Sequence, residues 1–266
     1  MSASDSQSLA RERFGRFAAA YVTSVNHATG PDLARLLTMA QPEPHWRALD
    51  IATGGGHTAL TFAPFVAGVV ASDLTPAMLE QAEAHIRGQG IHNVSYREAA
   101  ADDLPFDDES FELVTCRIAA HHFPDAPRFF QESARVLRPG GLLLLQDQAL
   151  PAHRPSATWI DDFERRRDPS HIRAYSETGW RRLFAGAGLH VEQGAPVVKR
   201  HNLQGWARRQ GNDGAAIARL DARLREAPAP AALWVAPRDL GGADASFLIR
   251  QVQLAGRKPA GGTGSP

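Results

Sequence analysis

The sequence predicts an α/β fold with a mostly parallel sheet and helices on both faces. From Trp46 onward, segments with strand patterns alternate with segments with helix patterns, which is typical of parallel strands joined by right-handed crossovers. Leu49 and Ile51 suit a buried strand, and the glycines at 54–56 suit a tight turn that leads into a helix. Residues 68–73 then give a second strand with an acid at its carboxyl end.

We expect residues 1–45 to form an N-terminal helical lid. Residues 1–7 look disordered, whereas 8–20 and 31–39 have helix patterns. Phe14 and Phe17 share one face of the first helix, so plain packing against the main domain is the alternative to a lid. The lid is suggested by the polar side chains that gather where the first helix pattern stops, namely Tyr21, Ser24, Asn26 and His27.

Residues 46–150 form the predicted ligand-binding core. After the strand at 68–73, Thr75 and Pro76 make a good helix start, because a hydroxyl stands at the cap and a proline in the first turn. Met78, Leu79, Ala82 and Ile86 give that helix its buried stripe. The remaining elements expected in this core are strands at 94–97, 111–116 and 142–145, a helix at 127–137 and a turn at 138–141.

Residues 151–258 are expected to complete the sheet and to add helices on the acceptor side, and residues 259–266 form a flexible tail. The regular alternation loosens after Pro151. The expected elements are helices at 159–167 and 177–187, a polar loop at 168–176, a strand at 189–198, one or two helices within 203–226, a loop-rich stretch at 228–242 and a last strand at 247–254.

Composition favours a protein that acts on small molecules. Apolar residues make up 43% and charged residues 22%, and 29 basic residues balance 29 acidic ones, so no net charge attracts nucleic acid or an anionic membrane. No apolar run approaches the ~20 residues of a membrane span. Cys116 is the only cysteine, which excludes an internal disulfide and fits a reducing cytoplasm. We expect a cytoplasmic monomer or homodimer.

The glycine turn predicts a nucleoside-containing cofactor but leaves its identity open. Gly54, Gly56 and Ala59 fit the dinucleotide pattern, and Asp73 stands about 20 residues on, where it could hold both hydroxyls of a ribose. Asp50 followed by small residues at every second position also fits a pattern for S-adenosylmethionine. A dehydrogenase and a methyltransferase are therefore both open at this point.

Four motifs in order decide between these alternatives. The chain resembles the class I S-adenosylmethionine-dependent methyltransferases, in particular the ubiquinone/menaquinone-biosynthesis-like (methyltransferase type 11) group. The resemblance implies a Rossmann-like seven-stranded, mostly parallel sheet and S-adenosyl-L-methionine as cofactor. The motifs are LDIATGGG at 49–56, ASDLTPAML at 71–79, DDLPF with SFELV within 102–114, and VLRPGG at 136–141.

The resemblance also implies a role for individual residues toward the cofactor. The backbone of Thr53, Gly54, Gly55 and Gly56 is expected beside its amino-acid part, with Asp50 supporting that loop or binding the ammonium through water. The other implied contacts are Asp73 with both ribose hydroxyls, Leu74 and Met78 with the adenine faces, Ala101 and Asp102 with the adenine edge, and Arg117 and Ile118 with the methionine portion.

The acceptor side has several candidate residues. His121 and His122 follow the fourth strand, where they act on substrate or merely hold the loop. The run at 168–176 with Trp180 resembles a signature of one subgroup of these enzymes. His171 would then be a base or hydrogen-bond donor and Arg173 an anion anchor, unless Asp168 and Arg173 pair to brace the loop. Asp147 could instead polarise an acceptor hydroxyl.

The resulting hypothesis is methyl transfer to a small-molecule acceptor, by O- or C-methylation of a phenolic or quinone-like compound. The catalytic candidates are His171, His122 and Arg173. The histidines show no metal-binding helix spacing, so no metal is expected. The alternatives are an NAD(P)-dependent oxidoreductase and a non-catalytic cofactor-binding protein, the latter favoured if the face above residues 117–122 is sealed.

Overall fold

The computed structural model describes residues 3–22 and 30–260. The expectations for Ser24, Asn26 and His27, and those for the side chains of Phe17 and Tyr21, lie outside what it describes. None of the described helices combines the length and apolar character that a membrane-spanning helix requires.

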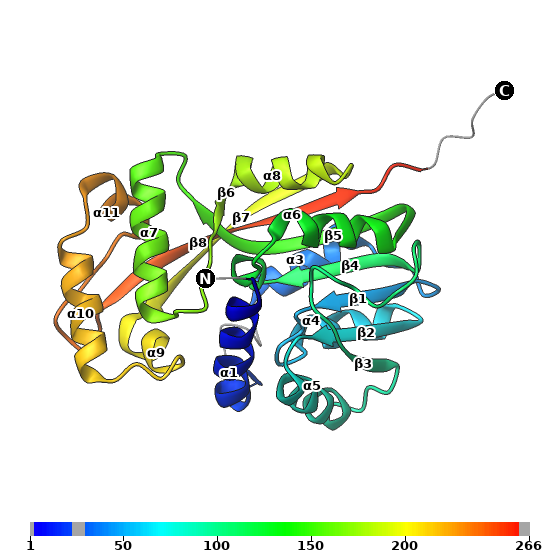
Figure 1. The fold of residues 1–266 in the computed structure, drawn as a ribbon, viewed down its shortest axis with the longest axis horizontal. Helices are drawn as coiled ribbons and strands as arrows, with labels where there is room; N and C mark the ends of the chain where they lie inside the picture. The colour runs from blue at the N-terminus through cyan, green and yellow to red at the C-terminus, as the bar shows by residue number, and fades with distance from the viewer. Residues whose placement is uncertain (1–2, 23–29, 261–266) are drawn as a thin grey trace.

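A central sheet carries the fold (Figure 1). Its strands run in the order β3-β2-β1-β4-β5-β8-β7, and the short β6 pairs with the end of β5. The pairs from β3 to β5 are parallel, whereas β8 is antiparallel to both of its neighbours. The order reverses beside β1, which places a crevice at the carboxyl ends of β1 and β4, where ligands bind in open α/β sheets.

The described elements follow one another as α1 (Ala3–Val22), α3 (Pro31–Ala40), β1 (Arg47–Ile51), α4 (His57–Phe62), η1 (Ala63–Phe65), β2 (Gly68–Asp73), α5 (Pro76–Gly88), β3 (Val94–Glu98), β4 (Phe111–Arg117), η2 (Ala120–His122), α6 (Ala126–Val136), β5 (Leu137–Leu150), α7 (Arg154–Arg167), β6 (Tyr175–Ser176), α8 (Glu177–Gly186), β7 (His190–Asn202), α9 (Leu203–Arg208), α10 (Gly214–Arg225), α11 (Ala229–Val235) and β8 (Ser246–Arg257).

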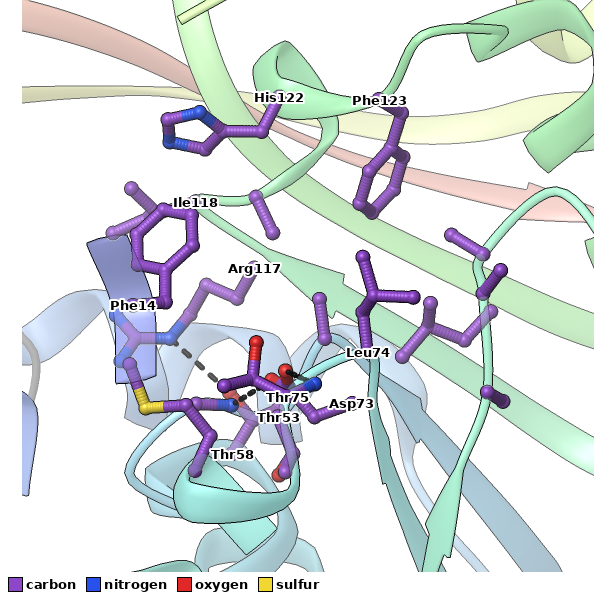
Figure 2. A pocket seen from close by; sticks show the side chains of 18 of the residues that line it. Phe14, Thr53, Thr58, Asp73, Leu74, Thr75, Arg117, Ile118, His122 and Phe123 are labelled. Carbon is purple, nitrogen blue, oxygen red and sulfur yellow. Dashed lines mark hydrogen bonds between the residues drawn. The ribbon is translucent and has the colours of Figure 1, made fainter. Parts of the chain in front are cut away.

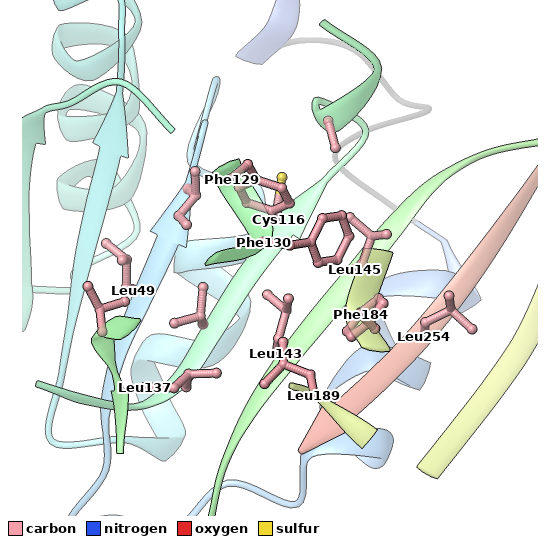
Figure 3. Packing of buried hydrophobic residues seen from close by; sticks show 14 of the residues in the cluster. Leu49, Cys116, Phe129, Phe130, Leu137, Leu143, Leu145, Phe184, Leu189 and Leu254 are labelled. Carbon is pink, nitrogen blue, oxygen red and sulfur yellow. The ribbon is translucent and has the colours of Figure 1, made fainter. Parts of the chain in front are cut away.

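Alternate residues of the central strands feed two separate cores, one on each face of the sheet. Leu143 and Leu145 of β5 pack on one face with Phe130 of α6, as Figure 3 shows. Leu142 and Leu144 pack on the opposite face, in the core formed with α3, α4 and α5. This period of two explains why the fifth strand reads as continuously apolar, because both of its faces are covered by helices.

A third apolar core lies beyond the sheet proper. Phe163 of α7 stacks on Trp206 of α9 with ring centroids 5.4 Å apart, and Phe247 of β8 packs against both rings. In Figure 1, α7, α9, α10 and α11 gather at this end of the sheet, with α1 between α9 and α5. The additions after β5 therefore form a wall beside the crevice.

Four expectations for local structure are wrong. Residues 3–7 are helical rather than disordered, and Gln7 hydrogen-bonds Asp102, a contact that local sequence does not reveal. The helix expected to begin at 159 begins at Arg154, with Pro155 in its first turn. Within 228–242, α11 forms because Ala231 and Val235 bury against the third core.

The turn expected at 138–141 is the fourth expectation that is wrong. These residues continue β5, with a register shift against β4 between Phe111 and Leu113. The backbone N–H of Gly140 donates to Lys258, and that of Lys258 donates to Gly141, so the end of the chain supplies the pairing. A glycine-rich turn signal is thus converted into a bulged strand by a partner far away in the sequence.

Candidate active site

A cavity lies over the carboxyl ends of β1, β2 and β4. We name it the first cavity; it contains about 1070 Å³ of empty space, part of which is open to solvent. Figure 2 shows Thr53, Asp73 and Thr75 near its base, with Phe14 of α1 and His122 on its other sides. Its lining is Gln7, Phe14, Ile51, Ala52, Thr53, Gly54, Gly55, His57, Thr58, Asp73, Leu74, Thr75, Met78, Ala99, Ala100, Ala101, Asp102, Arg117, Ile118, Ala119, His122, Phe123 and Pro124.

The glycine turn after β1 is held in place by backbone hydrogen bonds. The N–H of Thr53 donates to Ser72 of β2, and that of Gly56 donates to Thr53, each at 2.9 Å. Gly54 and Gly56 adopt positive φ values of 54° and 79°, which glycine tolerates without steric cost. A Cβ at Gly54 would have no atom within 4 Å, so the backbone there faces open space.

Gly56 has a second reason to be glycine, which gives a testable prediction. A Cβ there would come within 2.8 Å of the Ile86 side chain of α5. Gly56→Ala should therefore lower the free energy of unfolding, measured by urea denaturation without ligand, by about 1–3 kcal/mol through overpacking. Gly54→Ala is the matched control, since it shares the positive φ but has no such neighbour. Equal losses for both variants would show that packing against Ile86 does not matter.

Asp50 supports this turn from behind. Its carboxylate accepts hydrogen bonds from the hydroxyls of Thr53 (2.6 Å) and Thr115 (2.7 Å), and it is almost fully buried. Burial raises the pKa of Asp50 despite these hydrogen bonds. Asp50 and Gly56 do not line the first cavity, so of the two roles expected for Asp50 the geometry supports the structural one.

Asp73 links the turn after β1 to the N-cap residue of α5. One carboxylate oxygen accepts from the N–H of Gly54 (3.0 Å) and the other from the N–H of Thr75 (2.9 Å). Burial raises the pKa of Asp73 to about 6, although these N–H donors oppose the shift. A carboxylate fixed at the base of a cavity in this way can accept hydrogen bonds from vicinal hydroxyl groups.

The other expected cofactor residues meet around the same cavity. Leu74 and Met78 line it beside the loop that carries Ala101 and Asp102. Gln7 of α1 donates to the Asp102 carboxylate at 3.2 Å and also lines the cavity. The sequence pattern of α1 identified an apolar face but did not reveal this polar contact.

Arg117 and Ile118 form the side of the cavity toward β4. The Arg117 guanidinium donates to the Thr58 hydroxyl at 3.2 Å and approaches Asp32 of α3 at 3.4 Å. Ile118 has a positive φ of 57°, which is rare for a β-branched residue and marks a sharp change of chain direction after the strand. Its side chain stands where the first cavity meets a second one.

The second cavity shares Phe14, Ile118 and His122 with the first, and contains about 630 Å³ of empty space, some of it open to solvent. Most of its other walls come from β5, β7, β8 and the helices after β5. The residues that line it are Phe14, Ile118, His121, His122, Gln148, Arg167, Lys199, His201, Trp206, Arg209, Ile249 and Gln251. Sequence reasoning did not assign Lys199, His201, Trp206 or Arg209 to any site.

His121 is paired with Asp147 at the edge of this second cavity. Its Nδ1 lies 2.6 Å from Asp147, whose two oxygens also accept the backbone N–H groups of Gln148 and Ala119. Burial lowers the pKa of His121, but attraction to Asp147 outweighs it and the pKa is raised. Because Asp147 accepts from Nδ1, the other ring nitrogen is the one that can exchange a proton with a ligand.

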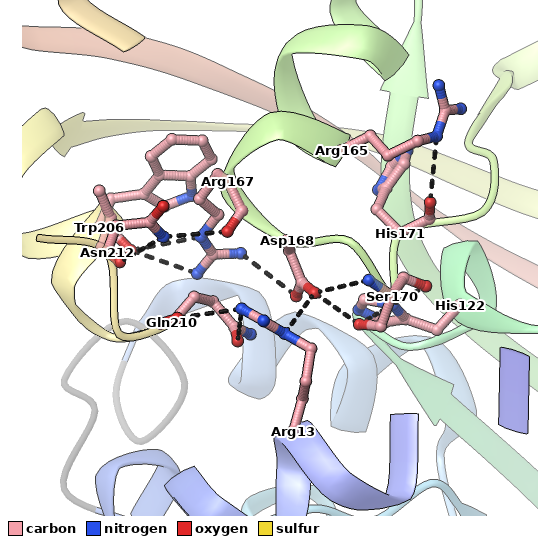
Figure 4. A network of polar contacts seen from close by, with 11 residues as sticks. Arg13, His122, Arg165, Arg167, Asp168, Ser170, His171, Trp206, Gln210 and Asn212 are labelled. Carbon is pink, nitrogen blue, oxygen red and sulfur yellow. Dashed lines mark hydrogen bonds and ion pairs between the residues drawn. The ribbon is translucent and has the colours of Figure 1, made fainter. Parts of the chain in front are cut away.

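His122 lines both cavities, and Figure 4 shows it beside Ser170. Its Nδ1 is 2.9 Å from the carbonyl oxygen of Ser170, so this nitrogen carries the proton and donates. Burial and the neighbouring His121 lower the pKa of His122 to about 3, so the ring is neutral at physiological pH. It can accept a hydrogen bond through Nε2 but is a weak base.

The other two catalytic candidates do not line either cavity. His171 is 2% exposed, and its Nε2 lies 2.8 Å from Asp161. Arg173 is exposed, with its guanidinium 4.8 Å from the Tyr175 ring centre. The alternative pairing of Asp168 with Arg173 is wrong, because the Asp168 carboxylate lies 3.4 Å from Arg13 and 3.9 Å from Arg167, as Figure 4 shows.

The residues present fit an adenosyl cofactor. The open side of Gly54 lets a ligand approach the backbone, the Asp73 carboxylate suits vicinal hydroxyls, and Leu74 and Met78 offer apolar surface to a flat base. Asp102 supplies a carboxylate at the far edge of this apolar surface. Within the described ranges, no group of three or more metal-ligating side chains is close enough to hold a metal ion.

Comparisons with known proteins agree with this geometry. Residues 49–145 match the family model described as a methyltransferase domain. The chain is 35% identical to the methyltransferase YcgJ of Bacillus subtilis (strain 168) over 202 residues. This alignment covers 74% of this chain and 78% of that protein. It is also 33% identical over 121 residues to the ubiquinone/menaquinone biosynthesis C-methyltransferase UbiE of Shewanella frigidimarina, over 44% of this chain and 48% of that protein.

Solved structures show the same similarity over most of the chain. The candidate methyltransferase BH2331 of Bacillus halodurans C-125 has 37% identity and a TM-score of 0.83, with 86% of this chain and 100% of that chain covered. The YcgJ structure from Bacillus subtilis has 31% identity and a TM-score of 0.80, over 87% and 99% of the two chains. The predicted Rossmann-like α/β fold is thereby confirmed.

Proposed function

Because this chain belongs to the methyltransferase family and is an S-adenosylmethionine-dependent methyltransferase, we propose that its methyl acceptor is a small aromatic molecule bound in the second cavity. The family excludes the alternative of a nicotinamide-dependent oxidoreductase. The observation that carries the proposal is the shared wall of the two cavities, at Phe14, Ile118 and His122. A molecule in the second cavity would meet the first cavity at that wall.

We assign cofactor binding to the first cavity. Asp73 would accept the ribose hydroxyls, Leu74 and Met78 would flank the adenine, and Ala101 and Asp102 would meet its edge. The backbone of residues 53–56 with Asp50 behind it, and Arg117 with Ile118, would hold the amino-acid and methionine portions. When bound, the cofactor supplies a methyl group on a positively charged sulfur, so the chain has chiefly to align the acceptor and exclude water. Such alignment supplies on the order of 7–11 kcal/mol.

The acceptor is proposed to be phenolic or quinone-like, with methylation at oxygen or carbon. Aromatic rings of Phe14, His122 and Trp206 line the second cavity and suit a flat molecule. The similarity to a C-methyltransferase supports carbon as the site of methylation. The open second cavity argues against a protein that only binds the cofactor, for which a sealed face was expected.

His121 is proposed as the base that removes a proton from the acceptor. It lines the second cavity, and Asp147 orients its ring and would stabilise the protonated form. His122 would accept a hydrogen bond from the acceptor without taking its proton. His171 keeps only a positioning role in this scheme. Its ring centre lies 5.2 Å from that of His121, and it lines neither cavity.

The division into a lid (1–45), a cofactor-binding core (46–150) and an acceptor-side region (151–258) belongs to the same proposal. Its support is that α1 contributes Gln7 and Phe14 to the cavities, and that Arg13 bridges α1 to Asp168 beyond the sheet. A cytoplasmic location, a monomeric or dimeric state and the small-molecule partner likewise remain part of the proposal.

The proposal is tested by a screen of phenols, quinols and amines with isotopically labelled S-adenosylmethionine, with methylated products detected by mass. We expect a product from a phenol or quinol. Product from amines alone would contradict the proposed acceptor class while leaving the methyltransferase assignment intact.

The raised pKa of Asp73 predicts that cofactor affinity depends on pH. Only the ionised carboxylate accepts hydrogen bonds from both hydroxyls, and its pKa is about 6 before binding. S-adenosylhomocysteine should therefore bind with constant affinity well above pH 6 and roughly tenfold more weakly at pH 5, measured by calorimetry. Asp73→Asn should bind weakly at every pH. A wild-type affinity that stays constant down to pH 5 would contradict this assignment.

A further inference from the structure

We propose that the methyl acceptor carries an anionic group, a carboxylate or a phosphate on or next to its ring, which the cationic end of the second cavity binds. This inference rests on the proposed function, because it assigns the second cavity to the acceptor. Three cationic side chains line that cavity, Arg167, Lys199 and Arg209, and no carboxylate lies among its described lining residues. A neutral acceptor would not explain why the lysine and arginine side chains in this lining have no carboxylate among them.

The three cations come from different elements and converge on one region. Arg167 ends α7, Lys199 lies on β7, and Arg209 directly follows α9. The Arg167 guanidinium lies over the Trp206 ring, 4.6 Å from its centre, and donates to the Trp206 carbonyl. An arginine over an aromatic ring, with two further cations in the same cavity lining, suits the recognition of a planar anion.

The nearby carboxylates stand behind the cations rather than inside the cavity. Asp32 binds Lys199 at 2.9 Å and also approaches Arg117, while Asp168 is shared between Arg13 and Arg167. Each of these two carboxylates therefore serves two cations, and the buried Glu164 also interacts with Arg167. The charged side chains that reach the cavity wall are thus the cations, while these carboxylates lie outside the lining.

His201 lies within the electrostatic influence of these three cations. Its ring lines the cavity and is buried. Burial, followed by repulsion from Arg209, Arg167 and Lys199 in that order of effect, lowers the pKa of His201 to about 3. An anion bound among these groups would reverse part of that effect, so the pKa of His201 is a spectroscopic indicator of the proposed ligand.

The cationic region and the expected site of methyl transfer are separated by a short chain of contacts. Arg167 approaches Asp168, Asp168 accepts from Ser170, and the Ser170 carbonyl binds His122 (Figure 4). His122 is the residue shared with the cofactor cavity. An acceptor whose nucleophilic atom and anion lie on different positions of one aromatic ring would place its anion toward Arg167 and its nucleophile toward His122.

The test compares binding of matched ligands to the full chain saturated with S-adenosylhomocysteine. The ligands are the hydroxybenzoate isomers, the corresponding hydroxybenzamides and the hydroxyphenyl phosphates, measured by calorimetry. We expect at least one anionic series to bind about 10- to 100-fold more tightly than its neutral amide. The stronger of the two anionic series identifies carboxylate or phosphate. Equal binding of anion and amide, or no binding of any anion, would overturn the inference.

Charge variants separate a specific site from general attraction. Arg209→Gln should remove most of the preference for the anion, Arg209→Lys should restore part of it, and Arg208→Gln, an exposed neighbour outside the cavity, should leave it unchanged. The pKa of His201, followed by NMR, should rise when the anion binds. An anion preference that survives Arg209→Gln, with no change at His201, would contradict the assigned site.

The outcomes also distinguish this inference from the proposed function. Methyl transfer to neutral phenols without any preference for anions would overturn the inference alone. Tight anion binding without methyl transfer to any phenol or quinol would support the anion site and contradict the proposed acceptor class.

Discussion

Asp73→Ala should weaken binding of S-adenosylhomocysteine by about 100- to 10,000-fold. In the proposed site, two hydrogen bonds from the ribose to a charged carboxylate would be lost, each worth about 1.5–3 kcal/mol, and every 1.36 kcal/mol corresponds to a factor of ten. The same change frees the N–H groups of Gly54 and Thr75, which both donate to this carboxylate. Calorimetry at pH 7.5 measures the loss.

The controls separate cofactor contact from loop support. Asp73→Asn keeps the shape of the side chain but not its charge, so this variant should bind S-adenosylhomocysteine more weakly than the wild type. Its melting temperature should be closer to that of the wild type than the melting temperature of Asp73→Ala is. Asp103→Ala removes an exposed carboxylate outside the cavity and should bind normally. If Asp73→Ala binds like the wild type, the ribose is held by other residues.

His121→Ala should lower the rate of methyl transfer by about 100- to 10,000-fold while leaving S-adenosylhomocysteine binding nearly unchanged. The base must be neutral to accept a proton, so the wild-type rate should rise with pH through the pKa of His121. Asp147 raises that pKa above the ordinary value of 6.5. The inflection should therefore lie above 6.5 in the wild type and move to lower pH in Asp147→Asn, together with a lower maximal rate. The measurement is a pH–rate profile with the acceptor found in the screen.

His171 provides the matched control for this prediction. It is also buried, also bound to an aspartate, and close to His121, but it lies outside both cavities. His171→Ala should lower the melting temperature without shifting the inflection of the pH–rate profile. If instead His171→Ala abolishes the inflection and His121→Ala preserves it, His171 is the base and His121 is not.

The part of the first cavity that β1 and β2 contribute could be predicted from sequence because its residues lie close together in the chain. The turn at 53–56 and Asp73 each follow directly from a strand, and parallel pairing of β1 with β2 brings their carboxyl ends together. Because each of these polar motifs stands at the end of a strand, the sequence shows both which residues they are and that they lie at the carboxyl edge of the sheet. The boundaries of β2 match the expected 68–73.

The second cavity and the loop beside it could not be predicted in the same way. The loop at 168–176 has a distinctive composition, but composition does not determine which way its side chains point. Asp161 of α7 binds His171, and Arg13 of α1 binds Asp168, so both partners come from outside the loop. His121 and Asp147 were both visible as residues that follow strands, yet their pairing depends on the register of β4 against β5.

The sequence by itself determined the α/β fold, the crevice at the carboxyl edge and the residues that face it from β1 and β2, because short-range periodicity and turn chemistry control these features. Only the tertiary structure decided that His121 rather than His171 lines the second cavity, and that Arg167, Lys199 and Arg209 meet there. These side chains come from segments far apart in the chain, and their convergence depends on how helices and strands pack, which no local pattern encodes.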